Sequence, residues 1–335
     1  AMSANEAAAG ATVTRPRASR SWRRPLVGLA VGAVLVLATF AGLDWLGTDY
    51  AYLAAYTVLQ FVVLATAWNI LGGYAGYVNF GTGAFFGLGS YSAVVLFQAL
   101  GAPLAVQIVA AAAVGAALGF GVGIMTLRLR GIFFAIATVA ILFIMETLMV
   151  NWRYVGGATG LQLLRPDVIA PFASYTRMLF VVMALLAVVA VSVARYVQVS
   201  WIGRGLRAIR DSEEAAESSG VPTLRLKVFA CTISGALMGA AGAPMPMYLS
   251  FIEPASTFSL NWGVSALAMP MIGGTAHWIG PVIGALLLGS IQQIVTVTIS
   301  NEINVLVVGV LLVLFVVLAP DGIVGLFKKW LRYFK

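Results

Sequence analysis

Few side chains in this 335-residue sequence are of types that carry out chemistry, and they exclude most enzyme classes. The only histidine is His277 and the only cysteine is Cys231, too few for the His and Cys ligand sets of a zinc site. No G-x-x-x-x-G-K-[ST] segment is present, so the chain has no P-loop to bind ATP. Ser90 and His277 are a pair that an intramembrane serine protease would need, but such pairs occur in nearly every chain. We expect no catalytic residue, metal site or bound cofactor, and an intramembrane enzyme is only the third hypothesis.

Glu146 is the most conspicuous isolated ionisable residue, because it lies in the apolar run AIATVAILFIMETLMV. An ionisable group at membrane depth is costly and marks a functional site by default. The residue is close to the outer end of its run, where its carboxylate could also reach water. Both interpretations, a transport pathway and simple exposure, stay open.

A glycine-rich segment between residues 69 and 91 combines a bendable backbone with hydrogen-bonding groups. Its glycines, which also allow close helix approach, include Gly72, Gly73, Gly81 and Gly83. Its polar and aromatic side chains include Asn69, Tyr74, Asn79, Phe80 and Thr82. A broken helix lining a cavity could present such groups to a zwitterionic solute. Close helix packing with an interfacial turn explains the pattern equally well, and GGTAHWIGPVIG, with Gly273 and Gly274, allows the same two interpretations.

The third feature is a charged segment, GRGLRAIRDSEEAAESSGV at residues 203–221, in a chain that is only 10% charged. Arg207 precedes Asp211 by four residues and Arg210 precedes Glu214 by four, a spacing that favours a surface helix. A solvated loop is the usual alternative for a run of charges. The segment is far longer than the other connections on its side of the membrane, which favours a helix that docks another protein.

The rest of this segment defines a buried side and an end for the predicted helix. Leu206 and Ile209 share an apolar side, with Ala216 nearby. Gly220 and Pro222 are expected to end the helix.

The elements that must position these residues are transmembrane helices. Hydrophobic residues make up 61% of the chain and the mean hydropathy is +0.97, well above the values of soluble domains. Apolar runs of about 18 residues or more recur, and each is a candidate transmembrane helix. We therefore predict an all-α polytopic membrane protein with about ten helices, at 26–43, 50–71, 80–100, 104–127, 131–150, 178–197, 228–250, 262–276, 279–299 and 303–319. The short run at 262–276, which contains Pro270, either spans the membrane or re-enters it.

The distribution of basic residues predicts cytoplasmic N- and C-termini. With that orientation, Arg153, Arg165 and Arg177 are the only outer residues among the 20 Lys and Arg residues. The net charge of +8 is thereby explained by topology, so nucleic-acid binding loses its support. The half made of helices one to five would begin inside, and the half made of helices six to ten would begin outside. This arrangement predicts two inverted five-helix halves.

The two ends of the chain differ from the membrane domain that we predict at 25–322. Residues 1–24 are expected to form a disordered, basic cytoplasmic arm, in which Ala1, before Met2, is a cloning remnant. A signal peptide is the alternative, but the run at 26–43 is long for one and no clear A-x-A site follows. Residues 323–335 alternate aromatic and apolar side chains with basic ones, which predicts an amphipathic helix at the inner membrane–water interface.

Several segments together resemble one family of transport proteins. The sequence Glu214-Ala215-Ala216-x-x-x-Gly220 resembles the EAA---G motif of permease subunits in bacterial ABC importers, although the later I-x-L-P part is absent. WNILGGYAGYVNFGTGAFFGLGSYSA, RLRGIFFAIATVA, NWRYVGGATGL and MIGGTAHWIGPVIGALLL occur in the expected order around it. The chain thus resembles a branched-chain amino acid permease of the LivM type over most of residues 65–290.

The resemblance implies a non-catalytic permease subunit in the bacterial inner membrane. Its expected partners are a LivH-type permease subunit, two ABC ATPase subunits that bind ATP and magnesium, and a periplasmic or lipid-anchored substrate-binding protein. Leucine, isoleucine and valine are the usual cargo, while similar permeases carry urea, short-chain amides or aromatic acids. A stand-alone secondary transporter or solute channel is the alternative, and the scarcity of membrane-embedded charges argues against its ion-coupled form.

The resemblance also distributes roles among the residues named above. The residues expected to couple the chain to the ATPase are Arg204, Arg207, Arg210, Glu213, Glu214, Ala215 and Gly220. Those expected along the translocation pathway are Asn69, Tyr74, Asn79, Phe80, Thr82 and Glu146.

Overall fold

Helices make up most of the chain that the structure describes. The computed structural model describes residues 49–126, 129, 131–163, 174–298, 301–319 and 322–333. The predicted arm at 1–24 and the predicted helix at 26–43 therefore lie outside the described residues. The long helices are α2 (Asp49–Ala75), α3 (Thr82–Leu100), α4 (Leu104–Thr126), α5 (Ile132–Asn151), α6 (Tyr175–Val199), α9 (Thr223–Gly242), α13 (Ile279–Thr298) and α14 (Asn301–Leu318).

Shorter elements connect these helices or follow them. They are the 3₁₀ turns η1 (Arg153–Val155) and η2 (Gly157–Thr159), and the helices α7 (Trp201–Asp211), α8 (Glu213–Ser218), α10 (Met245–Leu249), α11 (Pro254–Thr257), α12 (Leu260–Gly273) and α15 (Gly322–Tyr333). Two short strands, β1 (Leu161–Gln162) and β2 (Phe251–Ile252), pair antiparallel, with Leu161 opposite Ile252.

Seven segments of the described chain are long and apolar enough to cross a membrane, which confirms a polytopic all-α membrane protein. These segments are Tyr50–Ala75, Thr82–Leu100, Leu104–Met125, Ile132–Asn151, Tyr175–Val199, Thr223–Leu249 and Ile279–Thr296. The predicted run at 262–276 corresponds to α12, whose 14 residues are fewer than the roughly 20 that a crossing needs. It contains Pro270, and the chain turns at Gly274, with φ 113°.

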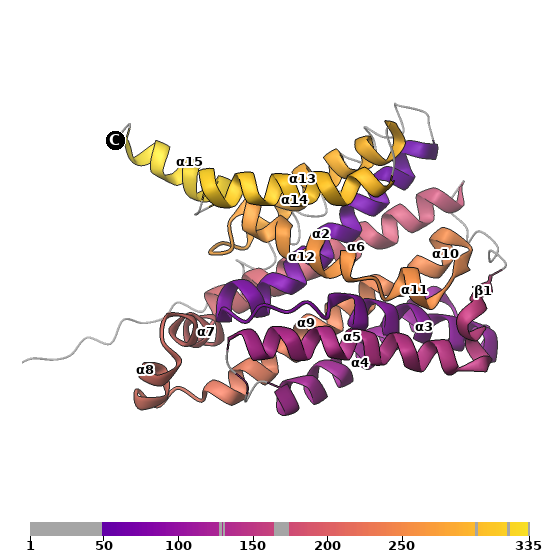
Figure 1. The fold of residues 1–335 in the computed structure, drawn as a ribbon, viewed down its shortest axis with the longest axis horizontal. Helices are drawn as coiled ribbons and strands as arrows, with labels where there is room; N and C mark the ends of the chain where they lie inside the picture. Colours follow the sequence, from indigo (N-terminus) through magenta and orange to yellow (C-terminus); the bar gives the residue numbers. More distant parts are fainter. Residues whose placement is uncertain are drawn as a thin grey trace, which may run out of the picture.

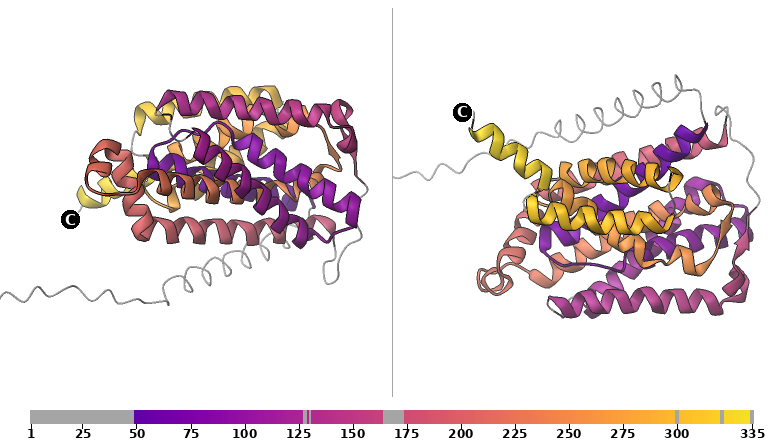
Figure 2. Two further views of the ribbon diagram at one scale, coloured as in Figure 1. Left: turned by 90° about the horizontal axis from the view of Figure 1, so that it is seen from below. Right: turned by 45° about the horizontal axis from the view of Figure 1, so that its top comes forward.

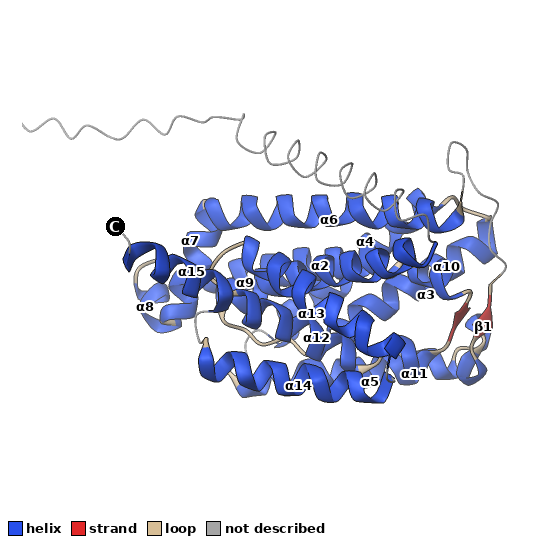
Figure 3. Cartoon of the chain, turned by 90° about the horizontal axis from the view of Figure 1, so that it is seen from above, coloured by secondary structure: helices blue, strands red, loops and turns tan. Residues whose placement is uncertain are grey.

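Helix α2 lies at the centre of the fold. It packs against α6, α9, α12 and α13, and Figure 3 shows it between α6 on one flank and α14 on the other. Its middle residues, including Leu64, Ile70 and Leu71, have no exposed surface. Such a helix, apolar all round, is typical of the core of a membrane bundle. Because Asn69 and Tyr74 are part of α2, the predicted pathway residues begin inside this core.

The short elements divide between the two ends of the bundle. Figure 1 shows α7 and α8 at one end and α10, α11 and β1 at the opposite end. The last described turns of α15 extend toward the α7–α8 end, as both views of Figure 2 also show. The predicted tail at 323–335 thus corresponds to a helix that begins at Gly322, with Leu326 and Phe327 exposed.

Glycines allow α4 and α9 to pack at backbone contact. A Cβ atom added at Gly119 of α4 would lie 2.6 Å from the carbonyl oxygen of Cys231 on α9. A Cβ atom added at Gly235 of α9 would lie 2.9 Å from the ring of Phe85 and closer still to the backbone of Gly115. Small residues on both helices let their backbones approach, the usual means of association between helices in membranes. This interface fixes the direction of α9, whose N-terminal turns follow α8.

We expect Gly119→Ala to destabilise the protein by about 1–3 kcal/mol, because the added methyl group meets a backbone carbonyl that cannot move aside. Gly121→Ala is the matched control, since a Cβ atom there has nothing within 4 Å. The control should stabilise α4 by about 0.5–1 kcal/mol through the higher helix propensity of alanine. Denaturant unfolding in detergent measures both, and equal effects would contradict the proposed contact.

Candidate functional site

The charged segment folds as two short helices, so the prediction of one coupling helix over 203–221 was wrong in this respect. Helix α7 ends at Asp211 and α8 begins at Glu213. Between them Ser212 has an extended backbone, with φ −163° and ψ 112°. Its Oγ accepts a hydrogen bond of 3.3 Å from the N–H of Ala215 and so caps the second helix. A serine that caps a new helix competes with continuation of the old one, which is the physical reason for the break.

The predicted end of the segment is confirmed at Gly220. This residue has φ +81°, a conformation that strongly favours glycine. Its N–H donates to the carbonyl of Glu217 at 2.9 Å, and the N–H of Val221 donates to the carbonyl of Ala216 at 3.0 Å. These two bonds form a Schellman motif, a common way to end a helix. Gly220 therefore shapes the end of α8.

The predicted apolar side of the segment is also confirmed. Leu206, Ile209 and Ala216 are buried, with 0%, 3% and 4% of their surface exposed. By contrast, Arg204, Glu214 and Ala215 are exposed on the opposite side. Arg207 is half-buried and donates from Nη1 to the carbonyl of Gln198 at 3.3 Å. The segment thus has one face against the bundle and one face open to a partner.

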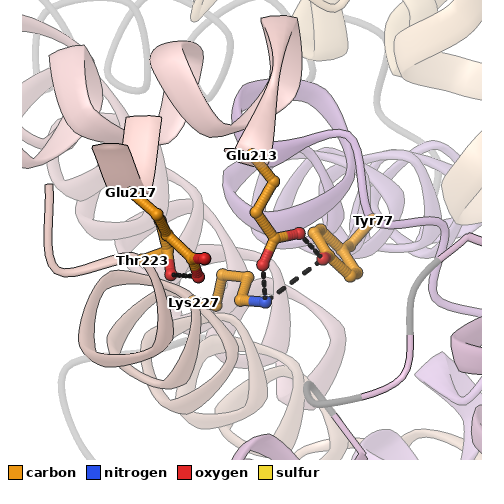
Figure 4. A network of polar contacts seen from close by, with 5 residues as sticks. All are labelled: Tyr77, Glu213, Glu217, Thr223 and Lys227. Atoms are coloured by element: carbon orange, nitrogen blue, oxygen red, sulfur yellow. Dashed lines mark hydrogen bonds and ion pairs between the residues drawn. The ribbon is translucent and has the colours of Figure 1, made fainter. Parts of the chain in front are cut away.

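The inward face of α8 carries a pair of acids that bind α9. The Nζ of Lys227 lies 2.6 Å from Oε1 of Glu213, and the Oγ1 of Thr223 donates to Oε1 of Glu217 at 2.6 Å. Both acids and both partners are spaced four residues apart, so each set lies on one helix face. Figure 4 shows the two contacts side by side. Lys227 is 3% exposed and the side chain of Glu213 is 14% exposed, so this ion pair is largely removed from water.

A third residue joins this pair to the α2–α3 connection. The hydroxyl of Tyr77 donates to Oε2 of Glu213, and Lys227 Nζ donates to the same hydroxyl at 3.2 Å. The ammonium also lies 4.9 Å from the centre of the Tyr77 ring, within the range of a cation–π contact. The other face of the connection packs on α5, where the rings of Tyr77 and Phe134 meet edge to face at 5.3 Å.

Helix α7 contacts the end of α2, just before the same connection. Nη1 of Arg210 donates to the carbonyl oxygen of Gly73 at 3.2 Å, near the C-terminus of α2. A basic side chain is favourable there because the last carbonyls of a helix carry a partial negative charge. Nε of Arg210 also lies 3.6 Å from Asp211. The predicted coupling residues Arg210 and Glu213 therefore contact Gly73 and Tyr77, inside the predicted pathway segment.

The structure places the predicted pathway residues on several different interfaces. Nδ2 of Asn69 donates to the carbonyl of Thr275 at 3.2 Å, whereas the hydroxyl of Tyr74 donates to the carbonyl of Ala194 on α6 at 3.4 Å. Oδ1 of Asn79 accepts from the N–H of Gly81 at 2.8 Å and stabilises the turn before α3. These three residues are buried and point toward three different partners.

The remaining pathway residues lie against α5 or at the start of α3. The N–H of Phe80 donates to Oγ1 of Thr138 at 3.1 Å. Thr82 is fully buried, and its hydroxyl makes no hydrogen bond within the described part of the chain. Glu146 is half-buried on α5, about 12 Å along the helix from Thr138, and so lies apart from the others.

The predicted structural glycines lie at close contacts, with backbone atoms in most cases and with the Trp68 ring at Gly72. A Cβ atom at Gly72, Gly73, Gly81 or Gly83 would come within 3.0 Å of Trp68, Thr275, Thr138 or Ser259, respectively. Gly273 meets the backbone of Gly280, and Gly274 has positive φ where α12 ends. The packing explanation for both glycine-rich segments is thereby supported at these positions.

Sequence reasoning missed Lys227 and Tyr77. A signal for Lys227 was present, because after Arg225 it is the last charged residue of α9, TLRLKVFACTISGALMGAAG, and the run that follows it has none. Glu146 was selected because an ionisable residue in an apolar run is costly and marks a functional site by default. The same argument applies to Lys227. Tyr77 carried no signal, since its partners are 136 and 150 residues away.

Comparisons with known proteins match the chain to a family of transport proteins. The family described as "Branched-chain amino acid transport system / permease component" matches residues 50–316. The chain is 28% identical over 303 residues to the high-affinity branched-chain amino acid transport system permease protein LivM of Salmonella typhimurium, covering 83% of this chain and 71% of that one.

Further relatives are a second permease of the same kind and a sugar permease that matches a shorter part of the chain. The LivH permease protein of Escherichia coli K12 is 24% identical over 286 residues, covering 79% of this chain and 91% of that one. The ribose import permease protein RbsC of Haemophilus influenzae is 29% identical over 126 residues, which is 36% of this chain and 38% of that one. No solved structure matches the chain significantly.

We expect Lys227→Met to destabilise the protein by about 3–5 kcal/mol, because it leaves the carboxylate of Glu213 buried without its cation. Adding Glu213→Gln to it should restore most of the lost stability, since no unpaired charge then remains. Arg225→Met, at an exposed position two residues earlier on the same helix, is the control and should change stability by less than about 0.5 kcal/mol. Denaturant unfolding of the wild type and the three variants measures these changes in stability. Equal effects of Lys227→Met and Arg225→Met would contradict the buried ion pair.

Proposed function

The chain belongs to the branched-chain amino acid transport permease family, and from that premise we propose that it is the LivM-type subunit of an ATP-driven importer in the bacterial inner membrane. The observation that carries the proposal is the two-sided structure of α8. One face is bonded to α9 and to the α2–α3 connection, while Glu214 and Ala215 on the other face are exposed. The exposed face is the proposed contact with an ABC ATPase subunit.

The surroundings of α8 suit such a contact. Helices α7 and α8 lie outside the seven candidate membrane segments and together at one end of the bundle. Arg204 on α7 and Glu214 on α8 give this end exposed charges of both signs. Exposed charges of both signs favour electrostatic complementarity with a protein partner and fix the register of docking.

The arrangement of the ends supports the proposed orientation. The α7–α8 end also receives the last described turns of α15, so two basic regions of the sequence lie on one side. An excess of Lys and Arg is typical of the cytoplasmic side. We propose cytoplasmic N- and C-termini on this basis, with two inverted halves as the accompanying topology.

The proposed complex contains this chain, a LivH-type permease, two ABC ATPases that bind ATP and magnesium, and a periplasmic or lipid-anchored binding protein. The names of the LivM and LivH relatives, both permease proteins of a branched-chain amino acid transport system, support the permease pair. The ATPases and the binding protein are proposed from the resemblance to ABC importers. The proposed cargo is a branched-chain amino acid, with urea, a short-chain amide or an aromatic acid as the alternative. A stand-alone transporter or channel would instead move solute without an ATPase, which uptake by the purified chain distinguishes.

We expect Glu214→Arg and Ala215→Arg each to reduce recovery of the ATPase by about tenfold or more, because a long cation in a tight interface costs more than about 1.4 kcal/mol. The measurement is ATPase co-purification through a tag on this chain, after expression with its permease and ATPase partners. Arg153→Glu is the control, as an exposed charge reversal at the opposite end of the bundle. Recovery that is unchanged in both α8 variants would overturn the docking proposal.

Gly220→Trp is unsuitable for this test, because Gly220 has positive φ and a tryptophan there would distort α8 itself. Glu214→Arg and Ala215→Arg leave the capping bonds of α8 in place. Their effect therefore reports on the exposed face alone.

We expect Thr82→Val to reduce ATP-driven uptake by about tenfold if the Thr82 hydroxyl binds cargo, since one lost hydrogen bond is worth about 1–2 kcal/mol. Folding stability should not fall, because this buried hydroxyl has no partner among the described residues. Thr66→Val is the matched control, a second buried threonine whose hydroxyl is likewise without a described partner. Equal uptake by both variants would remove Thr82 from the pathway.

A further inference from the structure

We propose that Tyr77, Glu213 and Lys227 form a joint that makes the docking helix α8, the membrane helix α9 and the α2–α3 connection move as one body. The inference rests on the proposed function, because it assumes that an ATPase moves α8. It goes further in separating two roles within α8. Glu213 becomes a positioning residue inside the permease, and the ATPase contact is left to the exposed side that carries Glu214.

The geometry of the joint is a closed triangle of polar contacts. Lys227 contacts Glu213 at 2.6 Å and Tyr77 at 3.2 Å, and the Tyr77 hydroxyl closes the triangle by donating to the second carboxylate oxygen. Each corner belongs to a different element, as Figure 4 shows. Any displacement of one element relative to the other two therefore breaks at least one charge-assisted hydrogen bond, the strongest class of such bonds.

Burial makes this joint stiff. With Lys227 only 3% exposed, water has little access to replace a broken contact. A buried charge that loses its partner is strongly unfavourable, whereas an exposed pair separates at little cost. By comparison, Arg210 and Asp211 on α7 form a contact of 3.6 Å with 34% and 74% of their side chains exposed, which does not restrain the segment in this way.

Neighbouring contacts set the direction in which the joint can transmit a displacement. Glu217 bonds to Thr223 one helical turn from the joint, so α8 cannot rotate about the Glu213 contact. On the far side, Tyr77 packs on Phe134 and the next residues bond to α5 through Phe80 and Thr138. A displacement of α8 is therefore passed to residues 77–82 and to the first turns of α5.

A purely structural role predicts different behaviour from a transmitting role. A pair that only stabilises the fold would change unfolding when altered and leave cargo uptake per ATP hydrolysed unchanged. A joint that transmits motion would let the ATPase bind and hydrolyse ATP while less cargo crosses. Uptake per ATP is thus the readout that a merely stabilising contact does not move.

The test uses the full complex of this chain, its permease partner, the ATPases and the binding protein in proteoliposomes, with leucine as the first cargo. Tyr77→Phe removes the hydroxyl and keeps both the ring contact with Phe134 and the buried ion pair. Tyr91→Phe is the matched control, because the Tyr91 hydroxyl is buried and has no hydrogen bond in the described part of the chain. The double variant Glu213→Gln with Lys227→Met removes the ion pair without leaving a buried charge.

We expect both joint variants to recover the ATPase as wild type does and to take up at least about fivefold less leucine per ATP hydrolysed, the lower end of typical couplings between sites. Wild-type uptake per ATP in both variants, or an equal fall in Tyr91→Phe, would overturn the proposal. Loss of ATPase recovery in folded joint variants would also overturn it, because the cluster would then only shape the docking surface. Failure of wild-type protein to recover any ATPase contradicts the proposed function instead and is seen before any joint variant is made.

Discussion

The free-energy cost of keeping the ammonium of Lys227 away from water shapes the whole α7–α9 region. With 3% of its surface exposed, this group needs an anion and a second acceptor at hydrogen-bond distance. Glu213 and Tyr77 supply them, and each comes from a different part of the chain. The break at Ser212 and the capping of α8 position Glu213 beside the cation, and the course of the α2–α3 connection positions Tyr77 there.

Close backbone contacts elsewhere hold the helices that carry Lys227 and its acceptors in place. Gly119 and Gly235 hold α9 against α4 so closely that added methyl groups would collide with backbone or ring atoms. Helix α2, buried on most sides, holds Gly73 and the start of the connection in the same way. The cation and its acceptors therefore belong to elements that cannot easily shift. The polar contacts between them thus fix how these elements are placed relative to one another.

The helices could be predicted from the sequence far better than the contacts between them. The ranges 80–100 and 104–127 correspond to α3 and α4 within two residues, because long apolar runs between glycines and prolines leave few alternatives. Two predictions that depend only on nearby residues were also confirmed. They are the apolar side formed by Leu206, Ile209 and Ala216 and the helix end at Gly220. The break at Ser212 was not predicted, because i,i+4 charge spacing is blind to a carboxylate whose partners lie in α9 and beside α2. For the same reason, grouping Asn69, Tyr74 and Phe80 by their closeness in sequence missed that each forms a hydrogen bond to a different distant residue: Thr275, Ala194 and Thr138, respectively.

Because α8 is short, its contacts with the membrane helices determine its orientation. A helix of six residues has too few internal hydrogen bonds to be stable alone, so its orientation comes from what its inner face binds. Glu213, Ala216 and Glu217 form that inner face, and each is bonded to or buried against the membrane helices. Glu214, which corresponds to the first position of the EAA motif, is exposed and lies on the outer face of α8, away from the joint. Adjacent glutamates on one short helix can therefore serve different ends, one fixing the helix to the permease and the other meeting the partner that moves it.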